Sequence, residues 1–244
     1  MSTEVNVLDV QPKKNWPPSL QALVAPGVGM ERQARVGSVW LPLCLAMVCS
    51  LSAGIIAARR VDARAATLRM LDTTGQLAGQ SDRQIEDAQK SAERSFVVQR
   101  IAVAVFAPGV WMCLFAVEVI GLGWFTRGRT KLKSVFPVAA AALLPFAIAD
   151  LLETFALLQH SSISSEPEPL VTSTLSQIAA ALGHPLAGNL GKLLASVELF
   201  SLWSAVLVAF GVASAAGVPT RRALFCTLVA WLAFRLLRTV VIGG

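Results

Sequence analysis

Long apolar runs dominate this 244-residue chain and limit what it can fold into. Each run has about 20 residues or more, the length with which an α-helix crosses a hydrocarbon core of roughly 30 Å. The runs cover approximately residues 39–58, 97–125, 135–158, 193–216 and 223–242. Since 55% of the residues are hydrophobic and only 15% are charged, a soluble globular domain is excluded. The sequence predicts an all-α integral membrane bundle of five transmembrane helices.

The short loops between the runs predict the orientation of the chain. Basic residues cluster in the loops after the second and fourth runs: Arg127, Arg129, Lys131, Lys133, Arg221 and Arg222. Residues 161–191 contain Glu166 and Glu168 but no Lys or Arg. Because basic short loops stay in the cytoplasm, we expect a cytoplasmic N-terminus and a C-terminus outside. The Ala-, Leu- and Arg-rich, Lys-poor composition favours the cytoplasmic (inner) membrane of a bacterium.

The segment after the first run opposes this orientation and also has structure of its own. Four arginines follow the run, but six acidic residues balance them, and long loops weigh less in topology. Ser81 and Gln84 have capping-box spacing, which predicts a helix start. The apolar residues after them recur on one helical face: Ile85, Ala88, Ala92 and Phe96. We predict an extramembrane helical hairpin over residues 60–96, with a solvated mixed-charge loop as the alternative.

The N-terminal 37 residues differ in composition from the five-span domain expected over residues 38–244. Residues 1–15 are polar and have the composition of a disordered tail. The next stretch, PSLQALVAPGVGMERQAR, has an apolar side and a basic end. It predicts a short amphipathic segment at the cytoplasmic membrane interface.

Five charged residues fall inside the predicted spans, where an unpaired charge is costly. They are Asp150, Glu153, Glu198, Arg235 and Arg238. Counted from the cytoplasmic side at about 1.5 Å per residue, Arg235 lies about 18 Å deep and Asp150 about 22 Å deep. We therefore predict one cluster that links the third, fourth and fifth spans. It would serve as a structural clasp, or else as an ion or proton relay or substrate anchor, and Arg238 has the further alternative of snorkelling to the interface.

The fourth run also carries small residues at every fourth position: Ala205, Ala209, Ala213 and Gly217. Such a stripe lets another helix approach closely. The approaching helix could belong to the bundle itself or to a membrane partner.

Motifs for catalysis are absent from the sequence. It contains no phosphate-binding loop, zinc-protease motif, nucleophile elbow or CxxC pair. The four cysteines lie within apolar runs, and His160 and His184 are too few for a metal site. We expect no enzyme activity, cofactor or metal. The net charge of +6 indicates membrane lipids with anionic headgroups as partners, and no nucleic acid.

The C-terminal third resembles the prokaryotic Yip family, membrane proteins related to the eukaryotic Ypt/Rab-interacting proteins. Members show an acidic residue followed by Leu-Phe, a Trp, a Leu-rich stretch ending in Gly, and a basic residue with Ala at the start of the last span. The matching positions here are Glu198, Leu199, Phe200, Trp203, Gly211, Arg222 and Ala223. The stretch LVAPGVGMERQARVGSVWLPLCL is similar to the region before the family's first span.

This resemblance implies a non-enzymatic membrane interaction or accessory protein that assembles with or regulates another membrane protein, with an ABC-type exporter as one candidate. The eukaryotic branch has a Tyr-containing cytosolic motif, and this chain contains no Tyr, so a Rab-type GTPase is not an expected partner. The alternative function is a small transporter or channel that uses the five intramembrane charges.

Overall fold

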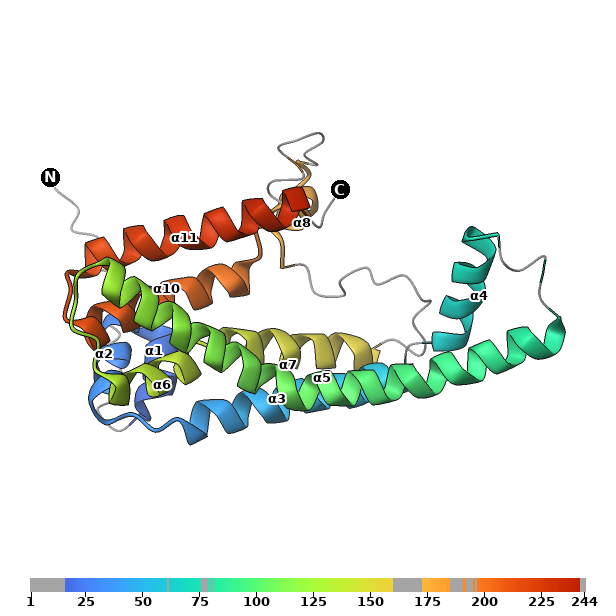
Figure 1. Cartoon of the computed structure of the whole chain (residues 1–244), viewed down its shortest axis with the longest axis horizontal. Helices are drawn as coiled ribbons and strands as arrows, with labels where there is room; N and C mark the ends of the chain where they lie inside the picture. The colour runs from blue at the N-terminus through green and yellow to red at the C-terminus, as the bar shows by residue number, and fades with distance from the viewer. Residues whose placement is uncertain are drawn as a thin grey trace, which may run out of the picture.

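The computed structural model describes residues 16–60, 62–75, 79, 81–159, 173–184, 191, 195 and 197–241, so the predicted N-terminal tail lies outside it. Within these residues the chain is all-helical and contains no strand (Figure 1). The helices are α1 (Pro18–Val24), α2 (Pro26–Val36), α3 (Trp40–Arg60), α4 (Ala63–Thr73), α5 (Asp82–Phe125), α6 (Leu132–Ala141), α7 (Leu144–Gln159), α8 (Leu175–Ala181), α10 (Leu199–Ala216) and α11 (Thr220–Val241).

The long helices run alternately in opposite directions along one axis (Figure 1). Among the described residues, four segments are long and apolar enough to cross a membrane: α3, α5, the α6–α7 segment and α10. This confirms an all-α integral membrane protein. The fifth expected span, α11, carries Arg221, Arg222 and Arg235 and is not one of the four, so it stays a prediction.

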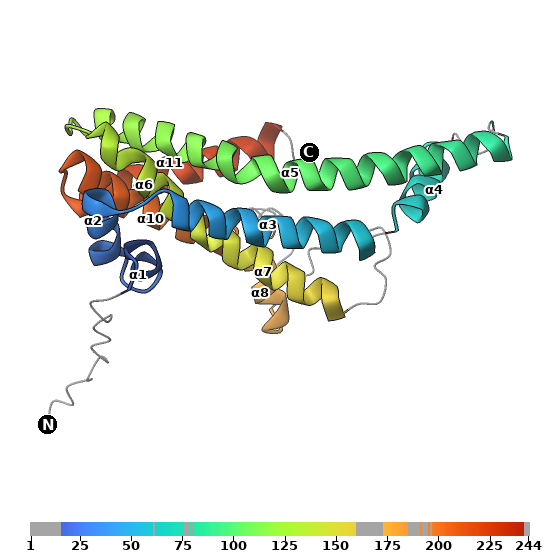
Figure 2. The same cartoon turned by 90° about the horizontal axis from the view of Figure 1, so that it is seen from below.

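Helix α5 is much longer than a membrane requires. It has 44 residues, which corresponds to about 66 Å at about 1.5 Å per residue. Ser81 caps its N-terminus in a full capping box with Gln84, which confirms the predicted helix start. Its N-terminal part extends beyond the end of α3, away from the bundle (Figures 1 and 2).

The third apolar run forms two helices, α6 and α7, rather than one. Pro145 has no N–H to donate to the carbonyl of Ala141, and a proline ring clashes with the carbonyl four residues earlier. The chain makes a turn at Ala142 and Leu143 instead, where the Leu143 N–H donates to the Ala140 carbonyl at 3.1 Å. The residues around this break are buried, so the break lies inside the protein.

The segment before the first span packs into the protein instead of lying only at the interface. Helix α2 contacts α6 and α10, and Met30 is fully buried. The side chain of Gln33 is also buried, and its Nε2 donates to the carbonyls of Ser38 and Pro137, both at 3.0 Å. The predicted interfacial segment therefore becomes part of one end of the bundle, because a buried polar side chain with two partners fixes its position.

Helix α10 lies at the centre of the bundle, whereas α3 and α5 lie at its edge. In the most apolar 18-residue stretch of each helix, 67% of the residues are buried in α10, but only 28% are buried in α3 and 28% in α5. The core combines small, β-branched and leucine side chains, such as Ala139, Val208, Val212 and Leu207. In a membrane, the exposed apolar side of α3 and α5 faces lipid or a partner helix.

Replacing Gln33 with Leu is expected to destabilise the protein by about 1–2 kcal/mol, since the two hydrogen bonds that the buried Gln33 amide donates to backbone carbonyls are lost while the volume is nearly kept. Thermal unfolding in mild detergent, followed by tryptophan fluorescence, measures this change. Gln99→Leu is the control because Gln99 is exposed on α5. Equal unfolding temperatures for the two variants would contradict a structural role for α2.

Candidate functional site

Helix α4 and the first part of α5, residues 82–98, form a projection that we call the arm. Asp62 caps α4 by accepting hydrogen bonds from the N–H groups of Arg64 and Ala65. The Nε of Arg64 donates to the carboxylate of Glu93 on α5 at 2.7 Å. Both side chains are about half exposed, so this pair is worth only about 0.2–1 kcal/mol. The predicted fold-back runs through residues 76–78 and 80, which lie outside the described residues.

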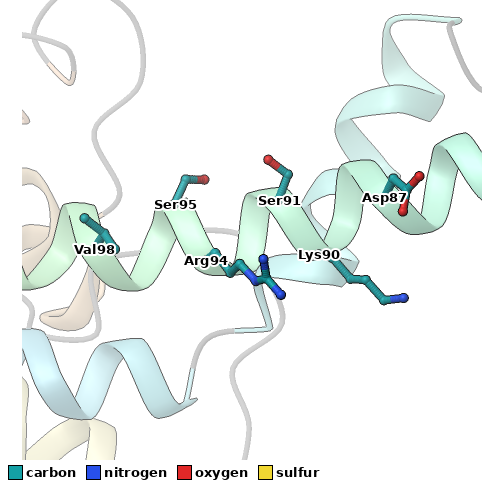
Figure 3. Close-up of a pocket in the computed structure, with 6 residues that line it drawn as sticks. All are labelled: Asp87, Lys90, Ser91, Arg94, Ser95 and Val98. Atoms are coloured by element: carbon teal, nitrogen blue, oxygen red, sulfur yellow. The ribbon is translucent and has the colours of Figure 1, made fainter.

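The arm has two different faces on α5. Ile85, Ala88, Ala92 and Phe96 are half-buried on one face, and α4 packs against this part of the molecule. The other face is an open groove lined by Asp87, Lys90, Ser91, Arg94, Ser95 and Val98 (Figure 3). Lys90 and Arg94 lie along one edge of the groove, and Ser91 and Ser95 lie along the other (Figure 3).

Lys90 also interacts with its own helix. Its Nζ lies 2.6 Å from a carboxylate oxygen of Glu86, one turn earlier. The hydrogen bond and positive charge of Lys90 lower the pKa of Glu86 below its ordinary value. Glu86 therefore loses its charge at a lower pH than an ordinary glutamate, and this exposed pair is present at neutral pH.

An ion pair joins α10 to α11 at the other candidate site. The guanidinium of Arg235 lies 3.3 Å from the carboxylate of Glu198 and also donates to the hydroxyl of Ser201. The guanidinium carbon lies 5.6 Å from the ring centroid of Trp231 on the same helix. The side chain of Arg235 is 13% exposed and that of Glu198 is 30% exposed. This arrangement satisfies a charge that would be costly if it were unpaired.

Glu198 does not lie one or two turns inside a helix, where the predicted span over residues 193–216 placed it. It is the N-cap of α10 and has an extended backbone, with φ −101° and ψ 132°. It forms an isolated antiparallel bridge with Thr174, supported by hydrogen bonds from Leu199 N to Ser173 O and from Leu175 N to Val197 O. Helix α10 therefore begins only after Glu198, and the Glu198 carboxylate reaches Arg235 from the N-terminal end of this helix.

The structure brings together Glu198 and Arg235 of the five charged residues singled out in the sequence. Asp150 and Glu153 lie one turn apart on α7, close enough to interact electrostatically, and Ser50 of α3 is near Asp150. Helix α7 packs mainly on α3. The backbone of Arg238 continues α11, but its side chain lies outside the described residues.

The residues that resemble the Yip family motif occupy structural positions around α10 and α11. Phe200 and Ala223 are buried, Trp203 packs against the core, and Leu199 and Arg222 are exposed. Gly211 lies where α2, α6 and α10 meet, and a Cβ there would lie 2.1 Å from Cγ1 of Val138. Packing therefore explains the buried members of the motif, Phe200, Gly211 and Ala223.

Comparison with protein families decides the relationship. The family model of the Yip1 domain matches residues 20–242. The chain belongs to the Yip1 domain family. No curated protein matches it, and no solved structure does. The Yip1 domain begins within α1, which agrees with the packing of α1 and α2 into the bundle.

Most of the small-residue stripe of α10 is buried within the helix bundle. Ala205 is 4% exposed and Ala209 is fully buried, and Ala213 packs against the core. Gly217 ends α10 as a C-cap in the left-handed region, with φ 67°, a conformation that favours glycine. Because its first two residues are buried, this stripe gives close packing within the bundle, whereas the arm presents an exposed surface to other molecules.

Proposed function

We propose that this Yip1 domain protein is a non-enzymatic accessory protein that assembles with another membrane protein in the bacterial cytoplasmic membrane, with an ABC-type exporter as the first candidate. The observation that carries the proposal is the arm. It extends outside the bundle (Figure 2), and α4 exposes Met70 by 68% and Leu68 by 38% beyond the apolar length of α3. Exposed apolar side chains on a short projecting helix suit a protein contact.

The proposed topology has five spans, a cytoplasmic N-terminus and an external C-terminus. The alternating direction of α3, α5, the α6–α7 segment, α10 and α11 supports it (Figure 1). The loop between α5 and α6, which carries Arg127, and the start of α11, which carries Arg221, lie at the same end as α2, opposite the arm (Figure 1). With these basic loops in the cytoplasm, the arm lies outside and meets the external part of a partner.

The surroundings of the charged residues also support an accessory protein over a transporter. Arg235 is engaged at once by Glu198, Ser201 and Trp231, which joins α11 to the start of α10. Groups that are held in this way suit the fixing of helix positions. A substrate or ion site requires groups that exchange partners during transport.

Affinity purification of the tagged protein in mild detergent, followed by mass spectrometry, tests the proposal. We expect a membrane complex at near-stoichiometric yield, lost when residues 62–96 are replaced by a Gly-Ser linker. We expect the same loss from Leu68→Ser with Met70→Ser, because these side chains are exposed and the bundle does not depend on them. Asp72→Ser, an exposed polar change on the same helix, is the control. Recovery of a discrete, stable protein without any partner would refute the proposal.

A further inference from the structure

We propose that the groove on α5 lined by Lys90, Ser91, Arg94, Ser95 and Val98 binds the headgroup of an anionic phospholipid, with the phosphate at Arg94 (Figure 3). This site goes beyond the proposed partner contact, which uses α4. The occupant is a lipid of the leaflet on the side of the arm.

The helix face that contains the groove changes from basic to apolar along its length. Arg83, Lys90 and Arg94 are separated by seven and four residues, which places them on one face of α5. The same face continues with the exposed apolar side chains of Val98 and Ile101. Asp87 also lies on this face and Lys90 pairs with Glu86, so Arg94 is the last basic group before the apolar part. The change from Arg94 to Val98 within about one turn matches the boundary between headgroups and acyl chains.

The groups within the groove suit a phosphate. Arg94 is exposed, and no ion pair links it to another of the residues that the structure describes. A guanidinium offers several N–H donors in the geometry that a phosphate accepts. The short side chains of Ser91 and Ser95 leave its approach open (Figure 3). Asp87 lines the outer end of the groove and repels an anion there, which places the phosphate at the end nearer the membrane.

The neighbouring helix supplies further positive charge at the same level. A Cβ at Gly54 of α3 would lie 3.2 Å from the carbonyl oxygen of Arg100, so these two backbones are in close contact. Because α3 and α5 are antiparallel, the end of α3 at Arg59 and Arg60 reaches the level of residues 94–96. The positive-inside rule disfavours arginines on the external side of the membrane. Anionic headgroups at this level balance the charge of the arginines that follow the first span.

The experiment uses the full chain in nanodiscs of mixed phosphatidylcholine and phosphatidylglycerol, with the co-purified lipids counted by native mass spectrometry. We expect phosphatidylglycerol to be enriched around the protein, and Arg94→Gln to lower this enrichment about fivefold, the effect of one basic residue near a membrane surface. Arg83→Gln is the matched control. It removes the same charge from the same face, but about 16 Å farther out at about 1.5 Å per residue, and should change nothing.

Three further results distinguish the lipid site from a site for a soluble anion or a protein partner. Excess glycerol phosphate should not displace the lipid, and displacement would assign the groove to a soluble anion. Equal enrichment for Arg94→Gln and the unchanged protein would overturn the proposal. Unchanged lipid with loss of a co-purifying protein would assign the groove to that partner and also overturn it. Circular dichroism of Arg94→Gln checks its fold, and Arg94→Lys, which keeps the charge, should retain most of the enrichment.

Discussion

Replacing Arg235 with Leu is expected to lower the free energy of unfolding by about 2–3 kcal/mol. The change leaves the Glu198 carboxylate without its counter-ion and removes the hydrogen bond to Ser201. Breaking a fully buried pair from one side costs about 3–5 kcal/mol. We expect less here because Glu198 keeps 30% of its side chain exposed. Thermal and denaturant unfolding in mild detergent, combined with retention on a sizing column, measure the loss.

A double-mutant cycle separates the ion pair from simple loss of packing. With Glu198→Gln as the second change, the double variant should be more stable than the sum of the single effects predicts, because neither charge is then left alone. Arg222→Leu, on the same helix but exposed, is the control and should stay within about 0.5 kcal/mol of the unchanged protein. A folded Arg235→Leu protein with unchanged stability and lost transport would instead support the small-transporter alternative.

The features of the fold that sequence predicts well are those set by local physics. The length of each apolar run follows from the thickness of a bilayer, and the helix start at Ser81 follows from a side chain that caps its own backbone. The apolar face of Ile85 and Phe96 follows from helical periodicity. Each of these depends on residues that are close together in the chain.

The features that sequence missed depend on how helices rotate against one another. The depths of Asp150 and Arg235 agree in the sequence, but depth says nothing about the direction of a side chain: α7 packs mainly on α3, whereas Arg235 pairs with Glu198. The burial of Gln33 depends on the carbonyl of Pro137, 104 residues away. The break before Pro145 did have a local signal, because a proline inside an apolar run removes a helical hydrogen bond.

Gly211→Ala is expected to destabilise the protein by about 1–3 kcal/mol, although alanine favours helices more than glycine does. The added Cβ would lie 2.1 Å from Cγ1 of Val138 and 3.1 Å from Cε of Met30. Val138 and Met30 are both fully buried, so neither has free space into which it could move. Helix α10 must then shift away from α2 and α6, and unfolding in detergent measures the cost.

Two further variants test whether crowding at this contact is the cause. Gly109→Ala adds the same methyl group to α5 where nothing lies within 4 Å, and it should leave stability unchanged or raise it slightly. Val138→Ala combined with Gly211→Ala removes the clashing methyl groups and should recover part of the loss. If the combined variant is as unstable as the two single changes predict together, the close approach of α10 to α6 is not what requires glycine at position 211. Recovery would show that this Yip1 motif glycine is needed for packing, because the space it leaves is filled by Val138.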